Sequence, residues 1–76
     1  MEGVVTSVTS ANGATYVVIN LGKKDKVQPG FTYDVFNGSV YKGRIFVHTV
    51  NESKSAATVD MSNAPISEGD RVVTRL

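Results

Sequence analysis

The residue types that usually perform catalysis or bind metal ions are sparse in this sequence. His48 is the single histidine, cysteine is absent, and the seven carboxylates are scattered along the chain. A zinc-type site needs several His or Cys ligands, and no carboxylate-rich loop of the EF-hand kind is present. No Gly-x-Ser-x-Gly motif marks a nucleophile. We therefore predict no catalytic residue, no metal, no cofactor and no enzymatic activity, and we interpret His48 as a strand residue beside a bulge.

One basic cluster could bind an anionic partner. It consists of Lys23, Lys24 and Lys26, with Asp25 between them. Such a cluster can contact phosphate groups or an acidic protein. A solvated loop is the more frequent outcome for a short charged run, and Asp25 dilutes its positive charge.

Aromatic residues supply a second candidate surface. Phe36 and Tyr41, together with Tyr16, fall out of phase with the inward-facing positions of their predicted strands. Exposed aromatic side chains can stack on nucleic-acid bases or anchor a protein partner. No basic groove accompanies them, so the sequence favours a protein partner. Covering the ends of a barrel is the alternative role for these residues.

Composition limits the class of protein. The 76 residues fit one domain, 1–76, and 41% hydrophobic residues suffice for a packed core. The formal charge of +1 argues against a dedicated nucleic-acid binder. No apolar run reaches the roughly 18 residues that span a bilayer. The N-terminus lacks the basic and apolar regions of a signal peptide, and we interpret Met1 as the start of a domain excised from a longer protein.

Six strands are expected from period-two alternation of apolar residues and from the turn signals between them. The alternation places Val17, Ile19 and Leu21 inward, as it does the groups 31/33/35 and 57/59/61. Gly43 is expected to mark a bend, and a bulge near His48 restores the phase of the longest run. The predicted strands are Gly3–Thr9, Thr15–Leu21, Phe31–Phe36, Val40–Val50, Ser55–Met61 and Arg71–Leu76.

Glycine-containing turns separate these strands. Gly13 and Gly38 follow asparagine, a pair typical of a type I′ hairpin turn. Pro29 and Gly30 fit the two central positions of a type II turn. Gly69 and Asp70 close the last loop, where Asp70 is expected to accept backbone hydrogen bonds. Residues 23–27 are expected to form at most a single helical turn.

The fold class predicted from these features is all-β, a small six-stranded barrel of the cradle-loop or SH3-like kind. Closure removes the exposed strand edges that so short a chain could hardly protect. A weak internal repeat suggests a pseudo-two-fold arrangement. Gly3 and Val5 align with 43 and 45 at an offset of 40, as do 17, 19 and 21 with 57, 59 and 61. Val27 and Gly30 align with 66 and 69 at an offset of 39.

Three segments together resemble a widespread bacterial pattern of the form PG-x-x-F-x-V, G-x-V and GD-x-V. These segments are Val27–Phe36, Gly43–Ile45 and Ile66–Val72. The chain is similar to the C-terminal β-barrel domain of flagellar assembly protein T and to barrel domains of other bacterial cell-envelope proteins. Ile66–Val72 also resembles the GD box of cradle-loop barrels. Tyr33 departs mildly from the pattern, which often has Phe there.

The resemblance implies a structural role in assembly, adhesion or scaffolding, in the bacterial periplasm or cell envelope. The leading hypothesis is therefore a non-catalytic protein–protein interaction module that binds itself, as a homo-oligomer, or another protein. The alternative is a small nucleic-acid-binding β-barrel. The partner-binding candidates are Phe36, Tyr41, Lys23, Lys24 and Lys26.

Overall fold

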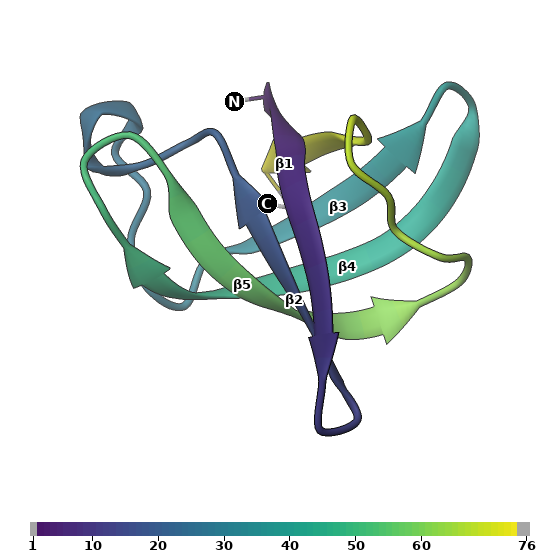
Figure 1. The fold of residues 1–76 in the computed structure, drawn as a ribbon. Helices are drawn as coiled ribbons and strands as arrows, with labels where there is room; N and C mark the ends of the chain where they lie inside the picture. Colours follow the sequence, from purple (N-terminus) through teal and green to yellow (C-terminus); the bar gives the residue numbers. More distant parts are fainter. Residues whose placement is uncertain (1, 75–76) are drawn as a thin grey trace.

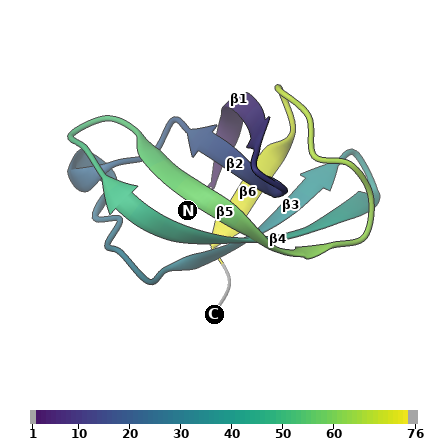
Figure 2. The same ribbon diagram turned by 60° about the horizontal axis from the view of Figure 1, so that its bottom comes forward.

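The computed structural model describes residues 2–74 as a closed barrel of six antiparallel strands in the order β1-β2-β5-β4-β3-β6 (Figures 1 and 2). A single 3-10 turn, η1, spans Lys23–Asp25, and no helix in the described part of the chain is long and apolar enough to cross a bilayer. The predicted six-stranded barrel is confirmed. The strands are β1 Glu2–Ala11, β2 Ala14–Ile19, β3 Thr32–Asn37, β4 Val40–Val50, β5 Ser55–Ser62 and β6 Arg71–Thr74.

The core fills the barrel with β-branched and aromatic side chains, as period-two alternation predicts. Val17, Ile19 and Leu21 are all buried, so the phase predicted for this segment is confirmed. Tyr33 and Val35 are buried as expected, and Ile45 and Val47 continue the core on β4. The remaining buried hydrophobic residues are Val5, Val27, Ala57, Ile66 and Val72.

Two residues predicted to face inward are exposed. Phe31 is 36% exposed because it belongs to the turn before β3 and not to the strand. Met61 is 40% exposed because β5 changes phase at Asp60. There Arg44 pairs with Met61 but its neighbour Ile45 pairs with Val59, which leaves Asp60 as an extra residue. A one-residue insertion turns the following side chains to the other face of the sheet.

The hairpin turns are formed as predicted at Gly13 but differently at Gly38. Asn12 and Gly13 have φ values of 51° and 78°, which a type I′ turn requires. In the β3–β4 hairpin Asn37 pairs with Val40, so the central residues are Gly38 and Ser39 rather than Asn37 and Gly38. Gly38 alone has a positive φ, 59°, which is the pattern of a type II′ turn.

The bulge predicted near His48 in β4 is also present. Val47 pairs with Ala57 and Thr49 with Ala56, so His48 is the extra residue. Near the other end of β4, Gly43 adopts a φ of 144°, and a Cβ there would lie 2.1 Å from the Met61 carbonyl oxygen. Only glycine allows the two backbones to approach this closely.

The barrel has pseudo-two-fold symmetry that relates β1, β2 and β3 to β4, β5 and β6. Exchanging the halves maps the cyclic strand order onto itself. The bulge at Thr6, between the pairs Val5–Ile19 and Ser7–Val18, matches the bulge at His48. In this register Val5 corresponds to Val47, and the pair Val35–Val72 corresponds to Tyr33–Thr74.

The turns obey the same symmetry. The amide of Gly30 donates to the Val47 carbonyl over 2.9 Å, and the amide of Gly69 donates to the Val5 carbonyl over 2.8 Å. Both glycines have positive φ, 96° and 94°, in turns of the type II pattern; Pro29 precedes the first glycine. The predicted offset of 39 is confirmed for the turns. The strand offsets are 42 between β1 and β4 and 38 between β2 and β5, so the predicted offset of 40 is wrong for the strands. The prediction compared residues by sequence position alone, whereas the equivalence of the strands follows from their pairing and bulges.

Candidate interaction surfaces

The two aromatic candidates, Phe36 and Tyr41, contact each other. Phe36 and Tyr41 are cross-strand neighbours on the outer face of the β3–β4 hairpin, with ring centroids 5.3 Å apart. Each ring is half-buried, and the Tyr41 hydroxyl donates to the Asp34 carboxylate over 2.9 Å. The two rings thus bury part of each other's surface. Their role in binding a partner stays a prediction.

The three lysines occupy a loop on the surface. Lys23, Lys24 and Lys26 are exposed, and Lys26 has a left-handed backbone with φ 65°. The amides of Lys23 and Lys24 donate to the carbonyls of Asn51 and Glu52 over 2.9 and 3.1 Å. These bonds tie the loop to the β4–β5 connection. The backbone of the loop therefore stabilises the fold, whereas its lysine side chains are exposed to solvent.

Asp70 is a buried carboxylate with a complete set of partners. It accepts from the Ser67 amide over 2.8 Å, as predicted for the turn, and from the Asn37 side chain over 2.9 Å. Lys42 donates to it over 3.2 Å and to the Pro65 carbonyl over 2.6 Å. Burial opposes ionisation of Asp70, but the hydrogen bonds and the Lys42 charge outweigh it and lower its pKa. This cluster joins β3, β4 and the segment before β6, and we assign it a structural role.

His48 lies on the outer surface of β4. Its Nε2 is 2.7 Å from the Thr58 hydroxyl oxygen, and its ring is 5.0 Å from that of Phe46. Within residues 2–74 no three His, Cys, Asp or Glu side chains are grouped so as to hold a metal ion.

An uncharged outer face extends across three adjacent strands around His48. Across it Tyr16 pairs with Thr58, and Thr58 pairs with Phe46. Tyr16 is 46% exposed. None of the residues of this face is Asp, Glu, Lys or Arg, whereas the outer face of β3 and β6 carries Asp34 and Arg71. We call it the β2–β5–β4 face, and it consists of Tyr16, Val18, Phe46, His48, Ala56 and Thr58.

Sequence analysis placed Tyr16 outward but missed the rest of this face. The outward positions of the runs 15–21, 40–50 and 55–61 already showed no charge between 45 and 49 or between 55 and 59. What the sequence did not give was the strand order that places β5 between β2 and β4.

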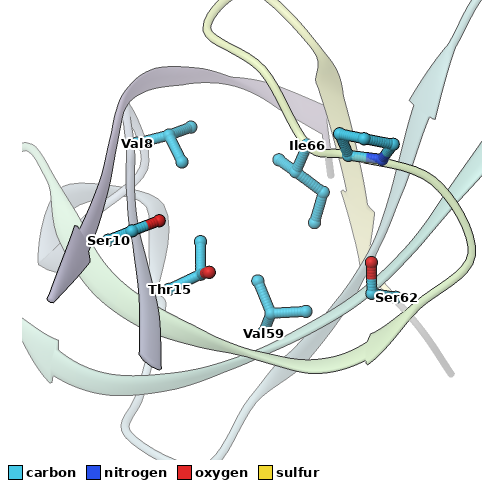
Figure 3. Close-up of a pocket in the computed structure, with 7 residues that line it drawn as sticks. Val8, Ser10, Thr15, Val59, Ser62 and Ile66 are labelled. Atoms are coloured by element: carbon cyan, nitrogen blue, oxygen red, sulfur yellow. The ribbon is translucent and has the colours of Figure 1, made fainter. Parts of the chain in front are cut away.

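A hollow of about 200 Å³ opens at one end of the barrel (Figure 3). Its base is apolar, with Val8, Val59 and Ile66, and three hydroxyl groups belong to Ser10, Thr15 and Ser62. The side chains labelled in Figure 3 point from β1, β2, β5 and the segment before β6 toward one common space. Pro65 completes the lining, which contains no charged residue. The predicted site residues do not include this hollow.

The comparisons with known proteins give no relative. The chain matches no protein-family model, and neither a curated protein nor a solved structure is significantly similar to it.

Proposed function

We propose that the domain is a non-catalytic interaction module that associates with a second copy of itself through the β2–β5–β4 face. The observation that carries the proposal is this continuous, uncharged face with the exposed Tyr16 and the neighbouring Phe46 and His48. The cores of protein interfaces are depleted in charged residues and enriched in aromatic ones. A surface of aromatic rings and hydroxyl groups fits this description.

A second copy is the partner that the charges favour. In a two-fold symmetric dimer the same patch meets itself, so a charge in it would be buried and would need an opposite charge elsewhere in the same patch. The β2–β5–β4 face has none, and the formal net charge of +1 adds little repulsion between copies. The chain exposes 4476 Å² in total, and a stable interface takes roughly 800 Å² from each partner, so the dimer contact must include surface around the six residues of the face.

The sequence resemblance also supports the proposal that the domain is an interaction module. It implies an assembly or scaffolding role in the bacterial cell envelope, and association through a preformed face is what such a role requires. A nucleic-acid-binding role has less support, because the formal net charge of +1 lacks the basic excess typical of such proteins.

Sedimentation velocity over a concentration range from about 10 μM to 1 mM tests the proposal. We expect a reversible dimer whose affinity changes little between low and high salt. The six residues of the face carry no charge, and the Arg44–Asp60 pair at its border is neutralised within one copy. Tyr16→Lys should weaken the dimer at least ten-fold, because it removes an aromatic anchor and buries an unpaired charge in the interface. Val40→Lys is the matched control: Val40 is 52% exposed on the β3–β4 hairpin, away from this face.

Three results would contradict the proposal. The parent chain could remain monomeric at 1 mM. Tyr16→Lys and Val40→Lys could weaken the dimer equally, which would remove the face as its cause. The double variant Phe36→Ser, Tyr41→Ser could be the one that becomes monomeric with an unchanged melting temperature, and the interface would then lie on the β3–β4 hairpin.

A further inference from the structure

The hollow has a counterpart at the other end of the barrel, and that counterpart is filled. Under the pseudo-two-fold symmetry Val8, Val59 and Ile66 correspond to Val50, Leu21 and Val27. The difference lies at one position: Leu21 is 6% exposed, whereas Val59 is half-buried. The other two positions match, since Val27 and Ile66 are both buried and Val50 and Val8 are both half-buried. We call the two regions the filled end and the open end.

The loops explain why the filled end is covered. Gly22 packs so closely on the β4–β5 connection that a Cβ there would lie 2.5 Å from the Asn51 carbonyl oxygen. The amides of Lys23 and Lys24 bond to the same connection. The hydrogen bonds of Lys23 and Lys24 to the β4–β5 connection therefore hold the adjacent Leu21 side chain inside the barrel.

The open end lacks this cover. The β1–β2 hairpin continues past the pair Val8–Val17 to Ala11 and Ala14, so it projects beyond the barrel (Figure 1). The segment after β5 turns away from the hairpin, because the amides of Asn63 and Ala64 donate to the Lys42 carbonyl over 2.8 and 3.0 Å. The hollow lies between these two diverging segments.

The filled end shows what kind of group suits this space. It is an aliphatic side chain of leucine size, carried on a backbone whose amide groups find acceptors at the rim. At the open end the rim acceptors are hydroxyl oxygens, those of Ser10, Thr15 and Ser62. A volume of about 200 Å³ lies below the range of pockets for drug-sized ligands, roughly 300–1,000 Å³, and suits a single side chain.

We propose that the open end binds a branched aliphatic side chain, such as leucine, presented by a partner polypeptide. The apolar base buries the side chain, and the hydroxyl groups bond to the peptide backbone that carries it. The absence of charged residues in the lining disfavours acidic and basic side chains, which would lose their hydration without an ionic partner. This inference concerns a different surface from the β2–β5–β4 face and does not depend on self-association.

Titration of the isotope-labelled domain with small peptide mimics, followed by amide NMR shifts, tests the inference. The probes are the N-acetyl amides of leucine, glycine and aspartate, and the titration is done on the Tyr16→Lys variant so that dimerisation does not interfere. We expect N-acetyl-leucine amide to bind with millimolar affinity, roughly ten- to hundred-fold tighter than the glycine amide, because it buries a whole apolar side chain. The shifts should centre on the amides of Val8, Thr15, Val59 and Ile66.

A matched pair of variants locates the site. Ser10→Phe places a ring in the hollow and should abolish the leucine-specific shifts. Thr9→Phe adds the same ring one residue away, on the outer face of β1, and should leave them unchanged. Ser62→Phe replaces Ser10→Phe if that variant does not fold.

Several outcomes would overturn the inference. Equal affinity for the leucine and glycine amides would show that the hollow does not recognise the side chain. Shifts confined to the β2–β5–β4 face would place the binding elsewhere. Tighter binding of 3-methyl-1-butanol than of the leucine amide would show that the hollow prefers a free small molecule to a polypeptide.

Discussion

The filled end and the open end of this barrel share a backbone register but not an interior. At the filled end Leu21 and Tyr33 occupy positions whose counterparts at the open end are Val59 and Val72. Leu21, Tyr33 and Val72 are all buried, whereas Val59 is half-buried beside a hollow. The strands are nearly equivalent, so the difference arises from side-chain size and from the loops. A hollow can therefore appear on a small barrel without any change in strand pairing, as is common for binding sites carried by loops.

The turns before β3 and β6 differ in the same way. Phe31 and Asp70 end equivalent turns, yet Phe31 is exposed and Asp70 is buried. Asp70 anchors the segment before β6 through Lys42 and Asn37, on the side that the hollow occupies. At the open end the polar cluster of Asp70, Lys42 and Asn37 thus stabilises the loop. At the filled end the buried Leu21 side chain and the backbone bonds of the loop have that role.

The largest effect is expected from removing that polar cluster. Asp70→Ala leaves the largely buried Lys42 ammonium without its counter-charge and with the Pro65 carbonyl as its remaining acceptor. It should lower the free energy of unfolding by about 3–5 kcal/mol. Phe31→Ala, at the equivalent turn position, should cost about 1 kcal/mol or less because Phe31 is exposed. Urea denaturation of both variants measures the difference. Equal costs would mean that the cluster does not anchor the open end.

The pH dependence of the same carboxylate gives an independent check. The pKa of Asp70 is lowered in the folded state, so its stabilising contribution is present above the unfolded pKa of about 4 and is lost as the pH falls through the lower folded pKa. Asp70→Asn keeps the shape of the side chain without its charge. The difference in unfolding free energy between the parent and Asp70→Asn should therefore shrink below about pH 4. A difference that stays constant down to pH 2 would contradict the lowered pKa.

A smaller effect on stability is expected from truncating the core residues Leu21, at the filled end, and Val59, at the open end. Leu21→Ala empties a filled position and should cost about 3 kcal/mol, through lost burial plus a cavity. Val59→Ala, at the counterpart position, should cost only about 1 kcal/mol, because Val59 already borders an open hollow. Thermal melts and urea titrations of the two variants test this order. If Val59→Ala were as costly as Leu21→Ala, the hollow would not exist in solution.

The strand pattern was readable from the sequence because local signals fix it. Alternation of Val17, Ile19 and Leu21 and the turn glycines at 13, 30 and 69 placed most elements within a residue or two. Met61 was assigned to the wrong face because nothing local marks Asp60 as a bulge. Bulges depend on the partner strand, and the sequence does not state which strands pair.

The β2–β5–β4 face and the hollow could not be predicted from the sequence, because they too depend on which strands pair. The β2–β5–β4 face exists only because β5 lies between β2 and β4. The hollow exists only because residues 63 and 64 bond to Lys42 instead of to the β1–β2 hairpin. Both features arise from contacts distant in the sequence, whereas the outward positions of Phe36 and Tyr41 follow from the alternation within one hairpin.

The smallest effect concerns the loop that covers the filled end. Lys26 ends η1 with a left-handed backbone, φ 65°, which is strained for a residue with a Cβ. Lys26→Gly relieves that strain but loses more chain entropy on folding, so the net gain should be below about 1 kcal/mol, seen as a melting temperature raised by a few degrees. Lys24→Gly removes an equal charge within η1, where φ is not positive, and should instead lower the melting temperature. If the melting temperatures of both variants shifted in the same direction, the loop would not hold Lys26 in the left-handed conformation. The loop over Leu21 would then be held only by the hydrogen bonds to Asn51 and Glu52.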